Sequence, residues 1–255
     1  QGSVIFHNVG EERGIAANIC FSILKDSRGM IWVGTLNGLS RYDGYHFTNF
    51  KTGKDSNSIV DDRVLDLCED KGGNIWGATS SGIFCYQVSQ KKFVNYIPPT
   101  YDFARSVMNI VCDKYNNIWA TTEWNIVKFN KNTQQFEEFD PFTKSKDSLG
   151  SYSVRQNGLI EDAKGRGLWF ATRTGLHFYD HTTKKMSSHK NASQFDIFNN
   201  HNVSALSISN DGICWMFDNV SQEAIAFDPV SYRVFNRVSL LPILGGEYVH
   251  TLKED

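Results

Sequence analysis

The stretch IWVGTLNGLSRYDGYHFTNF, residues 31–50, decides the fold because parts of it recur along the chain. Its opening block, IWVGT, returns in altered form as IWGAT, IWATT, LWFAT and CWMFD. Gaps of 44, 43, 50 and 46 residues separate the tryptophans of these blocks, Trp32, Trp76, Trp119, Trp169 and Trp215. A period of about 40 to 50 residues is typical of the four-stranded blades of a β-propeller.

Each copy has matching neighbours. An aspartate stands six residues before the first three tryptophans and seven before the fourth, whereas the fifth copy has Ser209. A polar turn, an apolar segment and a short aromatic segment follow each block, and no helical period interrupts them. In the first copy we expect four strands, at Ala17–Lys25, Met30–Thr35, Leu39–Tyr42 and His46–Phe50.

The sequence therefore predicts an all-β propeller of four-stranded antiparallel blades within a single domain, 1–255. Five complete blades are expected at about 15–50, 58–97, 104–140, 152–190 and 201–238. Residues 1–10 resemble a fourth strand and residues 246–255 a first strand, as when a propeller closes its ring with strands from both chain ends. Five blades with an orphan strand at each end indicate part of a longer protein, with a ring of seven blades. Such an open ring predicts dimerisation, swapping or disorder at its ends.

Composition excludes several classes of protein. The net charge is -2 and the isoelectric point about 6.4, so no basic field would draw the chain to nucleic acid or anionic lipid. No run of about 18 apolar residues and no leader peptide is present in the given sequence. The five cysteines form no C-x-x-C pair and are expected to be small buried residues.

The repeated residues have a structural interpretation. The aspartates are expected to bond the backbone of the turn between the first and second strands. The tryptophans are expected to pack between neighbouring sheets, with a ladder of ligand-binding rings as the alternative.

The first copy, from Asn18 through Asp26, Trp32 and Gly34-Thr35 to Gly44, resembles the two-component regulator propeller repeat. The resemblance covers nearly the whole chain and is weakest in the fifth copy. It implies the N-terminal part of the periplasmic sensor region of a Bacteroides-type hybrid two-component system, in an inner-membrane protein. Such a region is implied to detect an oligosaccharide and to control polysaccharide-utilisation genes. The implied partners are further propeller blades, a β-sandwich and a second receptor copy in a homodimer. The histidine kinase of such a protein is absent from this sequence, so no phosphoryl transfer is assigned to it.

Ligands of propellers usually meet the connections between blades and the turns between second and third strands, which we call the rim. Aligning the copies places Arg63, Arg105, Arg155, His201 and Tyr248 at matching rim positions. The three arginines could bind sulfate or carboxylate groups of an acidic saccharide, or could instead pair with Asp61, Asp62 or Asp102. The third rim turn holds Trp124, and Arg173 is its neighbour in the next blade. Trp124 could be a stacking platform for a sugar ring, a contact with another domain or a local packing residue.

Three classes of function remain open. The sequence has no histidine spacing typical of a metal site, no nucleotide-binding glycine loop and no nucleophile elbow, so no cofactor, metal or catalytic residue is predicted. A non-catalytic sensor is favoured, because the rim deviations are arginine, tryptophan and histidine without a convergent carboxylate pair. The alternatives are a propeller enzyme, such as a polysaccharide lyase or glycosidase, and a pure protein-interaction scaffold.

Overall fold

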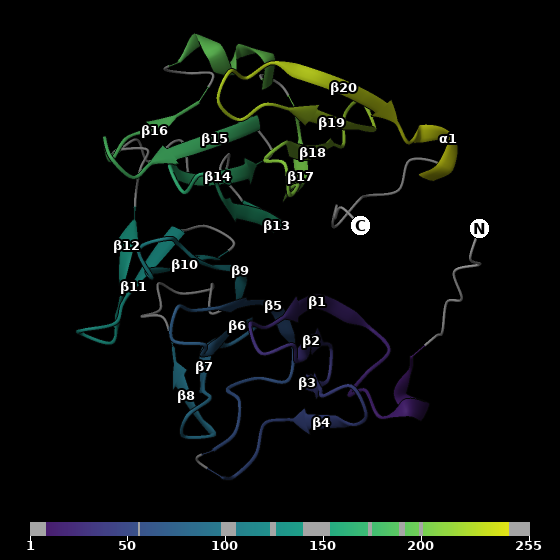
Figure 1. The fold of residues 1–255 in the computed structure, drawn as a ribbon, viewed down its shortest axis with the longest axis vertical. Coiled ribbons are helices and arrows are strands. Elements are labelled where there is room, and N and C mark those ends of the chain that lie inside the picture. Colours follow the sequence, from purple (N-terminus) through teal and green to yellow (C-terminus); the bar gives the residue numbers. More distant parts are fainter. Residues whose placement is uncertain are drawn as a thin grey trace. The chain divides into compact units, whose positions relative to one another are not determined.

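The structure of the protein is a computed structural model that describes residues 9–55, 57–97, 106–122, 126–139, 154–172, 175–188, 192–198 and 201–244. It does not describe the side chains of residues 138, 139, 154–157, 243 and 244 within those ranges. The chain divides into two compact units, residues 1–97 and residues 98–255. Figure 1 shows the five sheets, two in the first unit and three in the second, which we call blades 1 to 5 in chain order.

The elements of the first unit follow a short 3-10 helix, η1 (Glu11–Arg13). Blade 1 contains β1 (Cys20–Lys25), β2 (Ile31–Thr35), β3 (Gly38–Tyr42) and β4 (Phe47–Phe50). Blade 2 contains β5 (Val64–Glu69), β6 (Ile75–Thr79), β7 (Gly82–Gln87) and β8 (Lys92–Tyr96).

The second unit holds the other three blades. Blade 3 contains β9 (Val107–Cys112), β10 (Ile118–Thr122), β11 (Ile126–Asn130) and β12 (Gln135–Phe139). Blade 4 contains β13 (Val154–Glu161), β14 (Gly167–Thr172), β15 (Gly175–Asp180) and β16 (Met186–Ser187). The 3-10 helix η3 (Ser193–Phe198) leads to blade 5, with β17 (Val203–Ile208), β18 (Cys214–Asp218), β19 (Glu223–Phe227) and β20 (Val234–Ser239), and the short helix α1 (Leu241–Leu244) follows.

Every blade is a meander in which each strand pairs antiparallel with the next strand along the chain. The prediction of an all-β chain of four-stranded propeller blades is confirmed. The expected closing strand lies almost wholly, and the expected strand at 246–255 entirely, outside the described residues, so both stay predictions. Among the described residues, no helix has the length and apolar character needed to span a bilayer.

Bulges interrupt the first strands near their starts, a feature that the sequence analysis did not foresee. In blades 1, 2, 3 and 5 the pairing with the second strand skips one residue, which is Phe21, Leu65, Met108 or Ser204. A bulge breaks the two-residue alternation of side chains and re-aims those beyond it. The side chains of the rim residues at the starts of these strands therefore point in other directions than they would from a regular strand.

The tryptophans of blades 1, 3 and 4 pack against the next blade of their own unit. Trp32 lies 5.4 Å from the Tyr86 ring of blade 2, and Trp119 lies 5.5 Å from the Tyr179 ring of blade 4. Four of the five repeat tryptophans are buried, which confirms their interpretation as packing residues and excludes them as an accessible ligand ladder. Trp215 of blade 5 is only half-buried, and the described residues contain no sheet after that blade.

The repeated aspartates are buried turn residues, as predicted, and they also bind the tryptophans. The indole Nε1 donates to the aspartate at 2.9 Å in the Asp26–Trp32 pair, 3.0 Å in blade 2, 2.8 Å in blade 3 and 3.4 Å in the Asp162–Trp169 pair. The same carboxylates accept backbone N–H groups of the turn, such as those of Arg28 and Met30. Each carboxylate thus ties a turn to the core ring of its own blade.

One prediction about the cysteines is wrong. Cys85 and Cys214 are buried, but Cys68 and Cys112 are half-buried and Cys20 is exposed. Cys20 begins β1, and the matching first residues of blades 2 and 5, Val64 and Val203, belong to buried clusters shared with the preceding blade. The described residues contain no sheet before blade 1, so nothing there covers Cys20.

Gly34 allows blades 1 and 2 to approach each other closely. A Cβ atom at this position would lie 2.8 Å from the carbonyl oxygen of Val64 and 2.9 Å from its Cγ1. We expect Gly34→Ala to lower the free energy of unfolding by about 2 kcal/mol, because overpacking forces the sheets apart. Gly53→Ala is the matched control, since the nearest atom there lies at 3.8 Å. Urea denaturation followed by circular dichroism compares the two variants, and equal stabilities would contradict the close approach.

Candidate functional site

The described residues include only part of the predicted rim. Arg63 and His201 are described with their side chains, in different units, and Arg155 lies on β13 without a described side chain. Arg105, Trp124, Arg173 and Tyr248 lie outside the described residues. The grouping of these seven residues into one binding site therefore stays a prediction.

Arg63 stands just before β5 with an exposed side chain. Its guanidinium lies 5.4 Å from the centroid of the Phe21 ring, a cation–π contact. Asp61 bonds the Arg63 backbone N–H and the Ser81 hydroxyl instead, and no described carboxylate lies within 4.0 Å of the Arg63 guanidinium. The Arg63 guanidinium therefore forms no ion pair with Asp61 or Asp62, the first two of the three predicted partners. The third, Asp102, lies outside the described residues.

His201 is held by a buried carboxylate at the rim of blade 5. Its Nδ1 lies 2.8 Å from Oδ2 of Asp218, the last residue of β18. The His201 side chain is 17% exposed, whereas that of Asp218 is 1% exposed. Because the carboxylate fixes one ring nitrogen, the ring is oriented and Nε2 makes no hydrogen bond with the described residues.

Asp218 is itself anchored by the rim turn that it begins. Oδ1 accepts the backbone N–H groups of Asn202 and Val220, and Oδ2 accepts the N–H and the hydroxyl of Ser221. Blades 1, 2 and 4 have a threonine here, whose hydroxyl donates to the glycine carbonyl of the turn, as in Thr35 and Gly38. The aspartate in CWMFD, where other copies have threonine, is the sequence signal for this site, and it was not among the predicted site residues.

The stability of blade 5 should depend on the charge of Asp218. Burial raises the pKa of this carboxyl, but the bonds from His201, Ser221 and the backbone outweigh burial and hold its pKa well below its ordinary value. The folded state therefore binds this proton less readily than the unfolded state, whose aspartate pKa is about 3.9. The stabilisation is complete above that pH and is lost as the pH falls further.

We expect Asp218→Asn to lower the free energy of unfolding by about 2 kcal/mol at pH 7, because charge-assisted hydrogen bonds are lost. The deficit should shrink as the pH falls from 4 to 2, because the unfolded wild-type chain takes up a proton at Asp218 in this range more readily than the folded protein does. Urea denaturation of both proteins across this range gives the comparison. A deficit that stays constant with pH would show that the Asp218 charge does not stabilise the fold.

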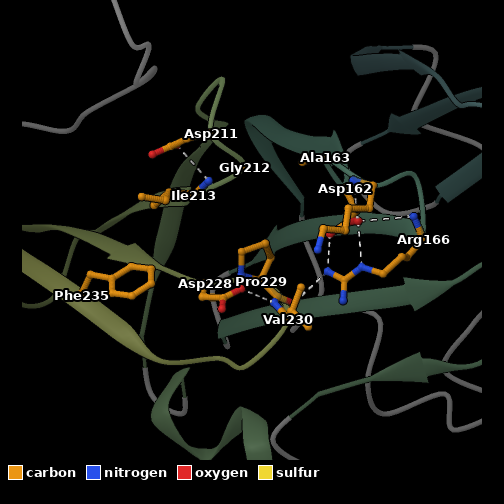
Figure 2. A pocket seen from close by; sticks show the side chains of 11 residues that line it. Asp162, Ala163, Arg166, Asp211, Gly212, Ile213, Asp228, Pro229, Val230 and Phe235 are labelled. Atoms are coloured by element: carbon orange, nitrogen blue, oxygen red, sulfur yellow. Dashed lines mark hydrogen bonds and ion pairs between the residues drawn. The ribbon is translucent and has the colours of Figure 1, made fainter.

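A cavity of about 280 Å³ lies at the other end of the second unit's blades, between blades 4 and 5. In a meander the turns after the first and third strands meet at the end opposite to the rim. The cavity is lined by such turns, at Asp162–Arg166, Asp211–Ile213 and Asp228–Val230, and by Phe235 of β20. Figure 2 shows Asp228, Pro229 and Val230 between the Phe235 ring and the Arg166 guanidinium.

The inner wall of this cavity is an ion pair. Arg166 donates from Nε and Nη2 to the two oxygens of Asp162, at 2.9 and 2.5 Å, and from Nη2 to the Pro229 carbonyl at 2.9 Å. Burial raises the pKa of Asp162, but the Arg166 bonds more than compensate and hold that pKa below its ordinary value. Arg166 thus neutralises Asp162 and joins the turns of two blades (Figure 2).

Part of the first repeat matches the sequence model of a known family. Residues 14–37 match the sequence model of the family described as "Two component regulator propeller". This segment of the chain is similar to a two-component regulator propeller repeat. The repeat spans the buried Asp26–Trp32 pair, the inter-blade contact of Gly34 and the start of the rim turn at Asn37. No curated protein gives a significant match.

Solved structures resemble the fold of this repeat protein over most of its length. They include the extracellular domain described as that of the hybrid two-component system BT3049 from B. thetaiotaomicron, at 20% identity, TM-score 0.69 and 90% of this chain. The extracellular domain of BT4673 from the same bacterium, described as a one-component system, matches at 19% identity, TM-score 0.68 and 87% of this chain. This chain covers 31% and 30% of those two domains, so it spans about a third of their length.

An enzyme has a similar fold as well. Virginiamycin B lyase from Staphylococcus aureus matches at 13% identity and TM-score 0.64, over 86% of this chain and 69% of the lyase. Because all three identities are low, these likenesses establish the propeller fold and leave function to the residues of the site.

Proposed function

We propose that this chain is part of the extracytoplasmic sensing region of a hybrid two-component system and that it binds an oligosaccharide without catalysis. The observation that carries the proposal is the two-component regulator propeller repeat at residues 14–37. The likeness of the fold to extracellular domains described as parts of one- and two-component systems supports it. In this proposal the kinase and the membrane anchor belong to other parts of an inner-membrane protein, and its signal controls polysaccharide-utilisation genes.

The proposed ligand contacts of the second unit lie at the rim. His201 supplies a ring fixed by a buried carboxylate, which is an oriented donor or acceptor for a sugar hydroxyl. Arg105, Trp124, Arg155, Arg173 and Tyr248 are the further proposed contacts, with the arginines suited to acidic groups and Trp124 to a sugar face. Arg63, whose guanidinium has no carboxylate partner among the described residues, is the proposed contact of the first unit.

The test is a calorimetric screen of neutral, sulfated and uronic-acid oligosaccharides against the chain, followed by Arg155→Ala and His201→Ala. We expect each substitution to weaken binding of a hit at least tenfold, since each removes a polar contact with the ligand. Lys185→Ala is the matched control, because Lys185 is an exposed cation of blade 4 in the turn between β15 and β16, at the end of the blade opposite to the rim. Binding that survives both rim substitutions unchanged would refute the rim as the site.

A second candidate function rests on the His201–Asp218 pair. A histidine oriented by a buried carboxylate can act as a general acid or base, and the fold is similar to that of a lyase. If this chain shortens or eliminates an oligosaccharide, and His201→Ala abolishes that activity, the catalytic function replaces the sensing function. An unchanged oligosaccharide that still binds supports sensing.

A further inference from the structure

The cavity between blades 4 and 5 lies where the preceding blade junction holds two ring side chains, those of His181 and Tyr115. At the junction of blades 3 and 4, His181 follows Asp180, and its ring lies 5.3 Å from Tyr115 and 5.6 Å from Tyr179. The register of the third strands makes Pro229, after Asp228, the counterpart of His181. Lys164, two residues after the turn aspartate, is the counterpart of Tyr115.

The walls of the cavity combine apolar surface with polar groups that are available to a ligand. Phe235 and Val230 are 53% and 48% exposed, so both offer apolar surface to a ligand. The Asp211 and Lys164 side chains are exposed, and neither has an ion-pair partner within 4.0 Å among the described residues. Asp228 accepts one backbone and one hydroxyl donor, from Val230 and Ser231, and keeps further acceptor capacity.

The charges around the cavity are balanced. Asp162 is neutralised by Arg166. The other charged lining residues are Asp211, Asp228 and Lys164, and Arg233 lies nearby with its guanidinium 5.9 Å from the Phe235 ring. Hydrogen bonds lower the pKa of Asp228 and of Asp211, so both are ionised acceptors at neutral pH. A strongly charged ligand gains little in such a site, whereas a neutral ligand with several hydroxyl groups finds both donors and acceptors.

We infer that this cavity binds one ring of a neutral saccharide. The C–H face of the sugar would pack on Phe235 and Val230, while its hydroxyl groups donate to Asp211 and Asp228 and accept from Lys164. A volume of about 280 Å³ lies just below the usual range for pockets of drug-sized ligands, which suits a single ring. The ligand class follows the proposed function, but the site lies at the opposite end of the blades from His201.

The experiment uses the complete chain and four neutral probes, the methyl glycosides of glucose, galactose, mannose and xylose, observed by saturation-transfer NMR and titrated by calorimetry. We expect at least one probe to bind and Phe235→Ala and Lys164→Ala each to weaken it at least fivefold. Val238→Ala is the matched control, because Val238 is an exposed apolar residue of the same strand that does not line the cavity. Thermal unfolding of each variant verifies that these surface substitutions leave the fold intact.

The outcomes separate this inference from the proposed function. Binding that is lost in Phe235→Ala and Lys164→Ala but kept in His201→Ala supports the cavity. If only His201→Ala abolishes binding, the cavity site is wrong and the rim site is supported. Tighter binding of methyl glucuronide than of methyl glucoside overturns the neutral ligand class, and binding of no probe overturns the inference.

Discussion

Replacing Trp169 by alanine is expected to lower the free energy of unfolding of the second unit by about 4 kcal/mol. Trp169 is fully buried and packs against Phe178 of its own blade at 4.6 Å and Phe227 of blade 5 at 5.6 Å, measured between ring centroids. It also belongs to a buried cluster that draws on both blades and on η3. Its removal leaves a cavity at the junction of the two blades, which rigid sheets fill only in part.

Trp215→Ala provides the matched comparison, because this tryptophan has the same place in blade 5 but is only half-buried. We expect a loss of about 1.5 kcal/mol, set mainly by the apolar area that returns to water. Guanidinium denaturation followed by circular dichroism measures both variants. Equal losses at the two positions would contradict the inter-blade packing assigned to Trp169.

Asp113→Ala is expected to lower the free energy of unfolding by about 3 kcal/mol, because several donors, among them the buried Trp119 indole, lose their acceptor together. The Asp113 carboxylate accepts the backbone N–H groups of Tyr115 and Asn117, the Asn117 amide and the Trp119 indole, all between 2.8 and 3.1 Å. A double-mutant cycle with Trp119→Phe isolates the indole bond, and we expect the two substitutions to be less than additive.

Asp43→Ala is the control for this prediction. Asp43 accepts two turn N–H groups, from Tyr45 and His46, but it is exposed, so water replaces the lost acceptor. Its effect should be clearly smaller than that of Asp113→Ala under the same denaturant. A comparable effect at both positions would show that turn bonding alone, rather than burial with the tryptophan, stabilises the blade.

Most of the blade architecture could be predicted from the sequence because its determinants are local. The spacing of Asp26, Trp32 and Thr35 encodes a turn and a strand within ten residues, and the same spacing recurs in later copies. The expected first strand of blade 1, Ala17–Lys25, is observed as Cys20–Lys25. The bulges escaped prediction because one extra residue leaves no mark in a strand of six residues.

The candidate sites were harder to predict because they combine side chains that are distant in sequence. His201 was identified by its place in the repeat, but its partner Asp218 was not, since their contact depends on how the rim turn of blade 5 closes. The residue pattern predicted ligand contacts only at the rim. The cavity at the other end gave no signal, because turns of two separate repeats line it and no single motif marks it.

The sequence by itself determined the blade: its four strands, its buried aspartate and tryptophan, and the small residue at Gly34, since these follow from hydrogen bonding and periodicity over a few residues. Only the tertiary structure decided which faces and turns of successive blades meet, and hence that Cys20 is exposed, that Asp218 holds His201, and that a cavity opens beside Phe235. The physical reason is that burial and cavity volume are properties of surfaces brought together from separate repeats, and no single repeat encodes them.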